Sequence, residues 1–327
     1  MATGEKQFFV KRTALEKSSP IGSRILRLLA LLPLLCVTGC LEFEDQTLTY
    51  RYDAGTDTLR IFQDYHGIFG ADDAAKVTDA EVEQLDSVLK EQRTFFFANW
   101  IFEYNREQLR ELLKELKNPE KRREMNQPET AIARYEKLMT LAVDNVRVEN
   151  DGFYFDAKGR LCGNQKVTVT RVTKLIAAGN DALREMTRAE AGKPETSAEQ
   201  KAVLLKAAAG PGDFIRLQGN AVTVRYPMTT REFAEMMDPG FSDARLLTGF
   251  KRQGGRITRT NDQVTFSLGG PADDVTTLTL PMATKPYVPN AVDAVRKRTG
   301  IREKFDPSSA SREFLNPPPP ASAGQKP

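Results

Sequence analysis

The stretch VRVENDGFYFDAKGRLCGNQKVTVTRV, residues 146–172, decides the fold class. It predicts a meander of strands at 146–148, 153–155, 161–162 and 167–172, because β-branched and aromatic residues cluster there between turn-forming residues. Asn150-Asp151-Gly152, Asp156-Ala157-Lys158-Gly159 and Gly163-Asn164 supply the residues that tolerate the positive φ angles of tight turns. Strands joined by such short turns pair antiparallel.

Similar strand-and-turn units flank this stretch on both sides. They are expected at 48–52 with 59–62 around the turn 53–57, at 214–217 with 222–226 around 218–220, and at 256–258 with 264–268, followed by a strand at 276–280. The spacings are irregular and the units share no residue pattern, so they do not form a sequence repeat.

The most extended helical pattern covers residues 78–117, which contain neither Gly nor Pro and are closed by Asn118-Pro119. Apolar residues recur there at helical spacing, which predicts a long helix. Unbroken, it would measure about 58 Å at 1.5 Å per residue, with a bend or break where a compact domain requires one. Shorter helices are expected at 129–141, 174–186, 197–209 with Ser197 as its N-cap, 230–237 and 290–298.

Antiparallel hairpins combined with separate helices predict an α+β fold, in which a meander packs with a long helix and several shorter ones. The chain divides into an amino-terminal leader over 1–39, a globular region over 40–305 and a Pro-rich tail over 306–327. The tail composition is typical of disordered or extended chain. The globular region has two possible subdomains, at about 40–190 and 197–305, joined by a polar connector.

The charge balance excludes nucleic acid as a partner. The whole chain of 327 residues has a formal charge of +3, but residues 1–39 hold six Lys and Arg against two acids. Residues 40–327 therefore carry 41 basic and 42 acidic residues, a net charge of −1. Such a chain lacks the excess of Lys and Arg with which nucleic-acid-binding proteins displace counterions from the phosphate backbone.

The leader has the charge order of a secretory signal. Residues 1–27 are basic and polar, and residues 28–37 form an apolar run. That run is about half the roughly 20 apolar residues that span a bilayer, and Pro33 interrupts it. Cleavage is therefore favoured over a retained transmembrane helix.

The run ends in Val37-Thr38-Gly39-Cys40, which resembles the lipobox of bacterial lipoproteins. The resemblance is confined to these four residues. It implies cleavage before Cys40, diacylglycerol on its thiol and acylation of the new amino group, so that the bilayer is a partner through acylated Cys40. Two or three acyl chains give stable anchoring where one does not. The implied location is the cell envelope, at the outer membrane or the periplasmic face.

Two alternatives to the lipobox stay open, an ordinary signal peptide with an incidental Cys and a buried core helix. The region before the apolar run is long and includes Glu5 and Glu16, which allows a downstream start codon. The residue after the cysteine is Leu41 and not Asp. In enteric lipoproteins, a residue other than Asp at this position is associated with export to the outer membrane.

An aromatic run in the middle of the predicted long helix is the candidate interaction patch. It is apolar on every side, so it predicts either a buried segment or a contact surface for a partner or membrane. Its candidate residues are Phe95, Phe96, Phe97, Trp100 and Phe102.

Catalytic patterns are scarce. One histidine, His66, excludes multi-histidine zinc sites, and no Gly-x-Ser-x-Gly elbow or phosphate-binding loop occurs. We expect His66 at a loop or sheet end beside Tyr65, and Cys162 as a packed structural thiol. No metal or cofactor site is predicted.

The remaining chemistry lies in charged residues. Two carboxyls held about 5 to 9.5 Å apart in a cleft would support glycoside hydrolysis, and the candidate acids are Asp151, Asp156, Asp213, Asp262, Asp273 and Asp274. The basic runs 114–123 and 251–259 are interpreted as solvated faces. The sequence favours a membrane-anchored, non-catalytic protein that binds or organises an envelope protein or polymer; the alternative is an exported carboxylate-dependent hydrolase.

Overall fold

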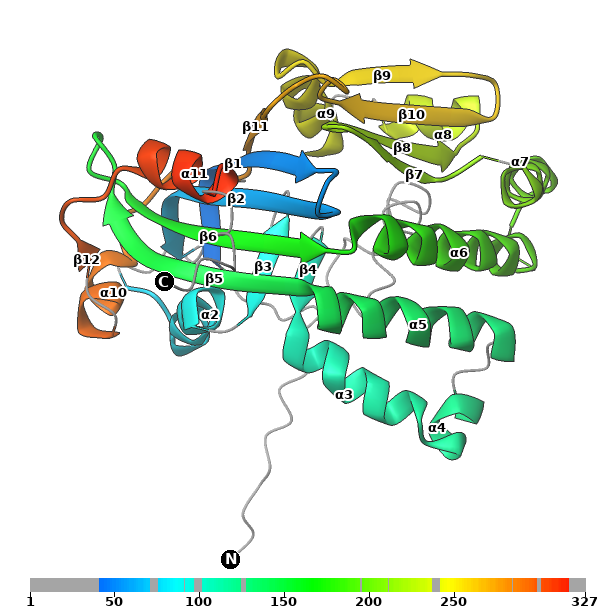
Figure 1. The fold of residues 1–327 in the computed structure, drawn as a ribbon, viewed down its shortest axis with the longest axis horizontal. Helices are drawn as coiled ribbons and strands as arrows, with labels where there is room; N and C mark the ends of the chain where they lie inside the picture. Colours follow the sequence, from blue (N-terminus) through cyan, green and yellow to red (C-terminus); the bar gives the residue numbers. More distant parts are fainter. Residues whose placement is uncertain are drawn as a thin grey trace, which may run out of the picture.

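A computed structural model describes residues 41–70, 76–90, 92–96, 102–124, 128–194, 196–210, 212–236, 242–283, 285–298 and 301–317. Antiparallel hairpins alternate with helices along these residues, which confirms the α+β class (Figure 1). The strands are β1 (Leu41–Asp53), β2 (Thr58–Gly70), β3 (Arg93–Phe96), β4 (Phe102–Asn105), β5 (Val146–Phe155), β6 (Leu161–Thr170), β7 (Ile215–Gln218), β8 (Ala221–Pro227), β9 (Arg256–Arg259), β10 (Gln263–Leu268), β11 (Thr276–Pro281) and β12 (Ile301–Arg302).

The helices of the described residues lie between and beside these strands (Figure 1). They are α2 (Asp79–Lys90), α3 (Arg106–Leu116), α4 (Pro119–Glu124), α5 (Glu129–Asn145), α6 (Val172–Ala191), α7 (Ala198–Ala209), α8 (Thr230–Met236), α9 (Ser242–Arg252), α10 (Val292–Arg298) and α11 (Pro307–Leu315). No helix among them is both long and apolar enough to cross a membrane.

A six-stranded sheet in the order β11-β1-β2-β6-β5-β12 forms the centre of the molecule. The predicted hairpin at 48–62 is confirmed as the ends of two longer strands, β1 and β2, which pair from Leu41↔Gly70 to Asp53↔Thr58. All neighbours are antiparallel except β12, which lies parallel to β5.

The two faces of this sheet differ in chemistry, because successive side chains of a strand point to opposite sides. The core face packs under α2, α3, α5 and α10 and carries residues such as Leu278, Leu161 and Val167, each at most 1% exposed. We call the opposite side the polar face. Paired residues across its strands include Thr47 with Asp64, Asp64 with Asn164, and His66 with Cys162.

A second, antiparallel sheet has the order β7-β8-β10-β9. It confirms the hairpins predicted around 218–220 and between 256 and 268, and its small core contains Met228 and Val264. The helix α7 begins after Ser197, whose side chain accepts a hydrogen bond from the amide of Gln200 at 3.2 Å, so the predicted N-cap is confirmed.

The single helix predicted over 78–117 is wrong. Its two ends form α2 and α3, and the hairpin β3–β4 separates them. Asn105 starts α3 as its N-cap, accepting from the amide of Gln108 at 3.1 Å. Pairing of β3 with β4, and contact of Thr94 with Tyr65 of the sheet, outweigh the local helical pattern because they bury Thr94 and Tyr104, which an isolated helix would expose.

The meander prediction over 146–172 is right about the strand regions but wrong in two of its turns, so the four predicted strands are two, β5 and β6, and β6 ends at Thr170 before α6 begins. Only Asp156–Gly159 forms a hairpin turn; Gly163 and Asn164 lie inside β6. Asn150-Asp151-Gly152 is a β-bulge in a continuous β5, where the register shifts and Gly152 adopts φ +94°. A bulge and a turn use the same residues, so composition alone does not distinguish them.

The tail prediction is also wrong in part. Residues 307–315 form α11, which starts at Asp306 as its N-cap and packs on β1 and β2 (Figure 1). Leu315 is 2% exposed at its end. Residues 318–327 lie outside the described part of the chain. The helices α4 and α9 and the strand β12 are additional elements that the sequence pattern did not indicate.

Candidate functional site

A connected group of ionisable side chains lies on the polar face of the large sheet. Asp45, His66, Cys162 and Tyr154 form one row across four strands, as their backbone pairing shows. His66 was expected at a loop or sheet end packed beside Tyr65. That expectation is wrong, because His66 lies within β2 and points to the opposite side of the sheet from Tyr65.

His66 is held between two carboxylates. Its Nδ1 lies 2.5 Å from Asp45 Oδ1 and its Nε2 lies 3.1 Å from Asp64 Oδ2. Ionised carboxylates only accept hydrogen bonds, so both ring nitrogens carry a proton. Burial alone lowers the pKa of His66, but the hydrogen bonds and charges of Asp45 and Asp64 outweigh it and raise that pKa to about 9.

Tyr154 completes the environment of Asp64 by donating its hydroxyl to Oδ1 at 2.6 Å. Burial, together with the neighbouring charge of Asp64, raises the pKa of Tyr154, so the phenol stays protonated. The ring of Phe305 lies 4.8 Å from the ring of Tyr154, and the guanidinium of Arg302 lies 3.5 Å from the centre of the Phe305 ring. The segment that leads into α11 therefore covers one side of the row.

Arg160 neutralises the other acids of the group. It contacts Asp156 Oδ2 at 2.7 Å, Glu44 Oε2 at 2.9 Å and Asp45 Oδ2 at 3.5 Å. Burial would raise the pKa of Asp156, but hydrogen bonds from the backbone and side chain of Arg160 lower it overall. A general acid for glycoside hydrolysis needs the opposite shift.

Cys162 lies in the same row, is 0% exposed and donates to the Arg160 carbonyl at 3.4 Å. Burial and the nearby acids Asp156 and Asp64 raise the pKa of its thiol to about 12. A nucleophilic cysteine needs a lowered pKa. The expected structural role of Cys162 agrees with its burial.

The group as a whole is arranged for fixed charge pairing. His66 is protonated at neutral pH and so is unable to act as a general base. The thiol of Cys162 and the phenol of Tyr154 hold their protons. The acids of the group are engaged by Arg160, His66 and Tyr154. No group of three or more His, Cys, Asp or Glu within the described ranges is placed to hold a metal ion.

The candidate acids from the sequence do not converge. Asp151 contacts Lys166 at 2.9 Å and Asp156 contacts Arg160, both on the large sheet. Asp262 contacts Lys206 at 2.5 Å beside the second sheet, and Asp213 is exposed. The last two acids lie in the loop before β11, where Asp273 accepts from the amide of Gly270 at 2.6 Å and Asp274 lies 3.3 Å from Arg51.

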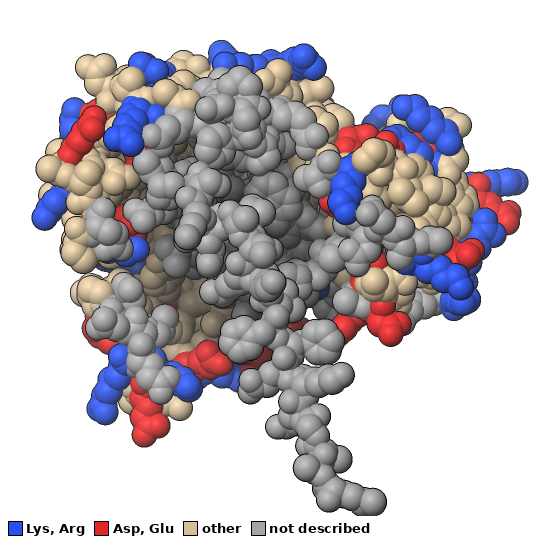
Figure 2. Space-filling model, turned by 180° about the vertical axis from the view of Figure 1, so that it is seen from behind, with Lys and Arg blue, Asp and Glu red and all other residues tan. Residues whose placement is uncertain are grey.

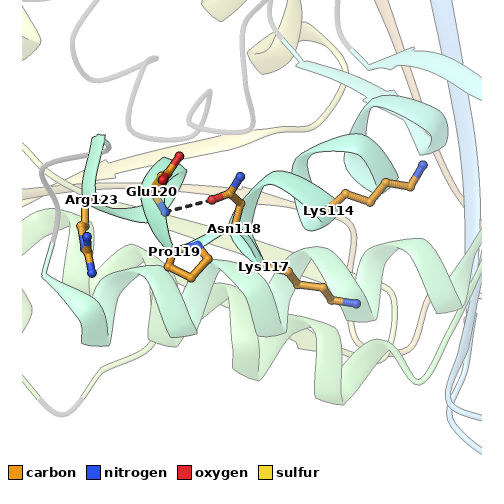
Figure 3. A pocket seen from close by; sticks show the side chains of 6 residues that line it. All are labelled: Lys114, Lys117, Asn118, Pro119, Glu120 and Arg123. Atoms are coloured by element: carbon orange, nitrogen blue, oxygen red, sulfur yellow. Dashed lines mark hydrogen bonds between the residues drawn. The ribbon is translucent and has the colours of Figure 1, made fainter.

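The basic run at 114–123 lines an open hollow of about 730 Å³ at the junction of α3 and α4 (Figure 3). Figure 3 shows Lys114 and Lys117 extending toward one end of it and Arg123 standing at the other, so the three cations do not converge on one point. Lys114 contacts Glu111 at 2.7 Å, and Asn118 Oδ1 accepts from the amide of Glu120 at 2.9 Å. These contacts agree with a solvated helix end.

The second basic run, 251–259, is also distributed. Lys251 and Arg252 are exposed at the end of α9, and the Arg259 guanidinium lies 5.5 Å from the centre of the Phe233 ring. From behind, Lys and Arg side chains stand in several separate groups around the rim of the molecule, with Asp and Glu beside several of them (Figure 2).

Two predicted sites fall outside the described residues. Cys40 is one, and Phe97 and Trp100 of the aromatic patch are the others. Phe95 and Phe96 lie in β3 and Phe102 lies in β4, so the backbone of the patch is a hairpin instead of a helix. For Phe95, Phe96 and Phe102 the structure describes the backbone and not the side chains.

Leu41, the first residue that the structure describes, directly follows Cys40. Leu41 is 1% exposed, starts β1 and donates its amide to Gln84 Oε1 of α2 at 3.1 Å. Its strand partner Gly70 is fixed by Asn290, which accepts from the Gly70 amide at 2.7 Å and donates to its carbonyl at 3.1 Å. Sequence patterns placed the first strand at Leu48 and missed this earlier start.

Comparisons with protein-family models, with curated proteins and with solved structures found no match.

Proposed function

We propose that this protein is a membrane-anchored lipoprotein of the bacterial cell envelope, cut before Cys40 and held in the bilayer by acyl chains on that residue. The observation that carries the proposal is the burial of Leu41. Leu41, directly after the lipobox-like Val37-Thr38-Gly39-Cys40, is already a packed strand residue with a bonded amide. A mature chain that begins at Cys40 would keep all of β1.

The proposed role of the anchored domain is binding or assembly of an envelope component rather than catalysis. The support comes from the polar face, where each strong acid or base in the row around His66 is paired with a group of opposite charge or a hydrogen-bond donor. Four acids do gather there, but Arg160, His66 and Tyr154 engage them. The other candidate acids lie in separate parts of the described chain, so no observation favours the alternative.

Metabolic labelling tests the anchor. Cells that express the wild-type chain should incorporate labelled palmitate into this protein, and cells that express Cys40→Ser should not. Mass spectrometry of the wild-type product should show an acylated Cys40 as the first residue. A product that retains Val37-Thr38-Gly39 before an unmodified thiol would disprove the proposal.

A further inference from the structure

The end of the domain that carries Leu41 has an exposed apolar and basic surface. Phe155 and Val288 are 36% and 41% exposed, and the exposed cations Lys285, Arg296 and Lys297 lie in the same part of the chain as Val288. We call these five residues the anchor-end surface.

A continuous set of contacts connects this surface to Leu41. Leu41 pairs with Gly70, and Asn290, two residues after Val288, bonds both backbone groups of Gly70. The hydroxyl of Tyr287 accepts from the amide of Leu161, which pairs with Phe155. The Arg296 guanidinium of α10 lies 5.7 Å from the centre of the Phe155 ring.

The position of the lipid limits how far this surface can lie from the bilayer. Consecutive Cα atoms are about 3.8 Å apart, so a lipid-bearing Cys40 is one peptide unit from a buried strand residue. No flexible spacer separates the two, and the end of the sheet beside α10 must then lie at the headgroups. In Figure 1 this end lies at the left with α10 and β12, and α7 lies at the far right.

The chain segment that carries four of these five residues is basic. Residues 285–304 hold six Lys and Arg and two acids, a net charge of +4, although the mature chain from Cys40 carries −1 in total. Cations close to an anionic leaflet are attracted to it within a Debye length, and exposed apolar side chains such as Val288 and Phe155 can enter the interface.

We propose that the anchor-end surface rests on anionic phospholipid headgroups, so that the domain lies against the membrane with α10 toward the bilayer and α7 away from it. This inference rests on the proposed lipid anchor. It adds the orientation of the domain and the lipid class that it contacts.

Site-specific fluorescence in proteoliposomes tests the orientation. The full-length, processed protein is reconstituted with a fluorophore on Val288→Cys or, as the matched control, on Leu205→Cys of α7, which is 45% exposed. Buried Cys162 does not compete for the label. In vesicles of phosphatidylglycerol and phosphatidylethanolamine that contain nitroxide-labelled lipid, we expect a roughly twofold loss of emission at 288 and almost none at 205.

A charge reversal tests the lipid class. Lys285→Glu with Lys297→Glu should restore most of the emission at 288, and Lys201→Glu on α7 should not. Vesicles of phosphatidylcholine alone should quench the label at 288 less than the anionic vesicles do. Equal quenching in both lipids would overturn the anionic preference.

The mass of the purified protein separates the two proposals. If Cys40 carries acyl chains and positions 288 and 205 are quenched equally, the orientation is wrong and the anchor stands. If the protein carries no lipid, or the wild-type chain without an introduced Cys takes up label at a free Cys40, the anchor fails and the orientation fails with it.

Discussion

His66 is a charged residue held between two carboxylates, although the sequence predicted that it packs beside Tyr65. His66 follows Tyr65 in a strand, and strand alternation sends the two side chains to opposite faces. Tyr65 enters the core, and His66 meets Asp45 and Asp64. The pairing of β1 with β2 brings Asp45 to this position from 21 residues away, so the sequence around His66 does not show it.

The charge of His66 predicts a pH-dependent loss of stability. Because the pKa is raised from 6.5 to about 9 in the folded state, the stabilisation is fully present below pH 6.5 and is lost as pH rises toward 9. The free energy of unfolding should fall by about 2 kcal/mol between pH 6.5 and 8.5 relative to His66→Gln. Urea unfolding of both proteins across this range measures the difference, and parallel pH curves would contradict it.

At the scale of elements, the hairpin β3–β4 shows why a helical pattern failed. Thr94, in β3, is 0% exposed and lies 2.9 Å from the hydroxyl of Tyr65. The single hydroxyl proton of Tyr65 is shared between Gln63 Oε1, at 2.6 Å, and Gln165 Oε1, at 2.8 Å. These buried groups need hydrogen-bond partners from separate strands. The hairpin is held on the core face by this polar network, which no local periodicity encodes.

Tyr65→Phe should destabilise the protein by about 1 to 3 kcal/mol, because the amides of Gln63 and Gln165 lose a buried donor. A double-mutant cycle with Thr94→Val should give a non-additive result, since the two residues share the network. Denaturant midpoints of the four proteins measure this. Additive losses would show that Tyr65 acts through packing alone.

The amino-acid composition of residues 307–315 did not predict the helix α11. Its segment, Pro307–Leu315, contains Ser and Ala and precedes a run of prolines, yet Asp306 caps it by accepting from the amide of Ser308 at 3.0 Å. Packing on β1 and β2 then stabilises a helix too short to persist alone.

Leu315→Ala should cost about 2 to 4 kcal/mol, because a side chain that is 2% exposed leaves a cavity over the sheet. Ser309→Ala, at an exposed position of the same helix, should change the stability by less than about 0.5 kcal/mol. Thermal unfolding followed by circular dichroism compares them. A Leu315→Ala midpoint equal to that of Ser309→Ala would show that α11 does not support the sheet.

At the scale of the molecule, one buried residue joins the two sheets. Asn220 lies between β7 and β8 and is 2% exposed. Its Oδ1 accepts from the amide of Tyr52 in β1 at 2.6 Å, and its Nδ2 donates to the carbonyls of Asp273 and Asp274 at 2.8 and 2.7 Å. The Tyr50 hydroxyl donates to the Asn220 carbonyl at 2.9 Å.

Asn220→Ala should therefore weaken the docking of the second sheet and lower the free energy of unfolding by about 2 to 4 kcal/mol, since several buried groups lose their partner together. Gln218→Ala, exposed in the same hairpin, is the control. Hydrogen exchange should show faster exchange in β8 and β10 of Asn220→Ala. Unchanged exchange there would mean that Asn220 does not couple the sheets.

Much of the strand content was predictable, because each hairpin of the second sheet combines β-formers with a local turn such as Gln218-Gly219-Asn220. The candidate site was less predictable. The row Asp45, His66, Cys162 and Tyr154 comes from four strands, and its members are ordinary residues when taken one at a time. Two signals were present but weak: alternation places His66 opposite Tyr65, and Leu41 begins an apolar–polar alternation right after Cys40.

The sequence by itself determined the α+β class, the hairpin turns at 53–57, 156–159 and 218–220 and the lipobox-like motif, since these depend on residues near one another in the chain. Only the tertiary structure decided that 93–105 is a hairpin, that 150–152 is a bulge and that 307–315 is a helix. It also decided which acids surround His66. The physical reason is that burial and hydrogen bonding between distant strands outweigh local propensities that differ by about 1 kcal/mol per residue.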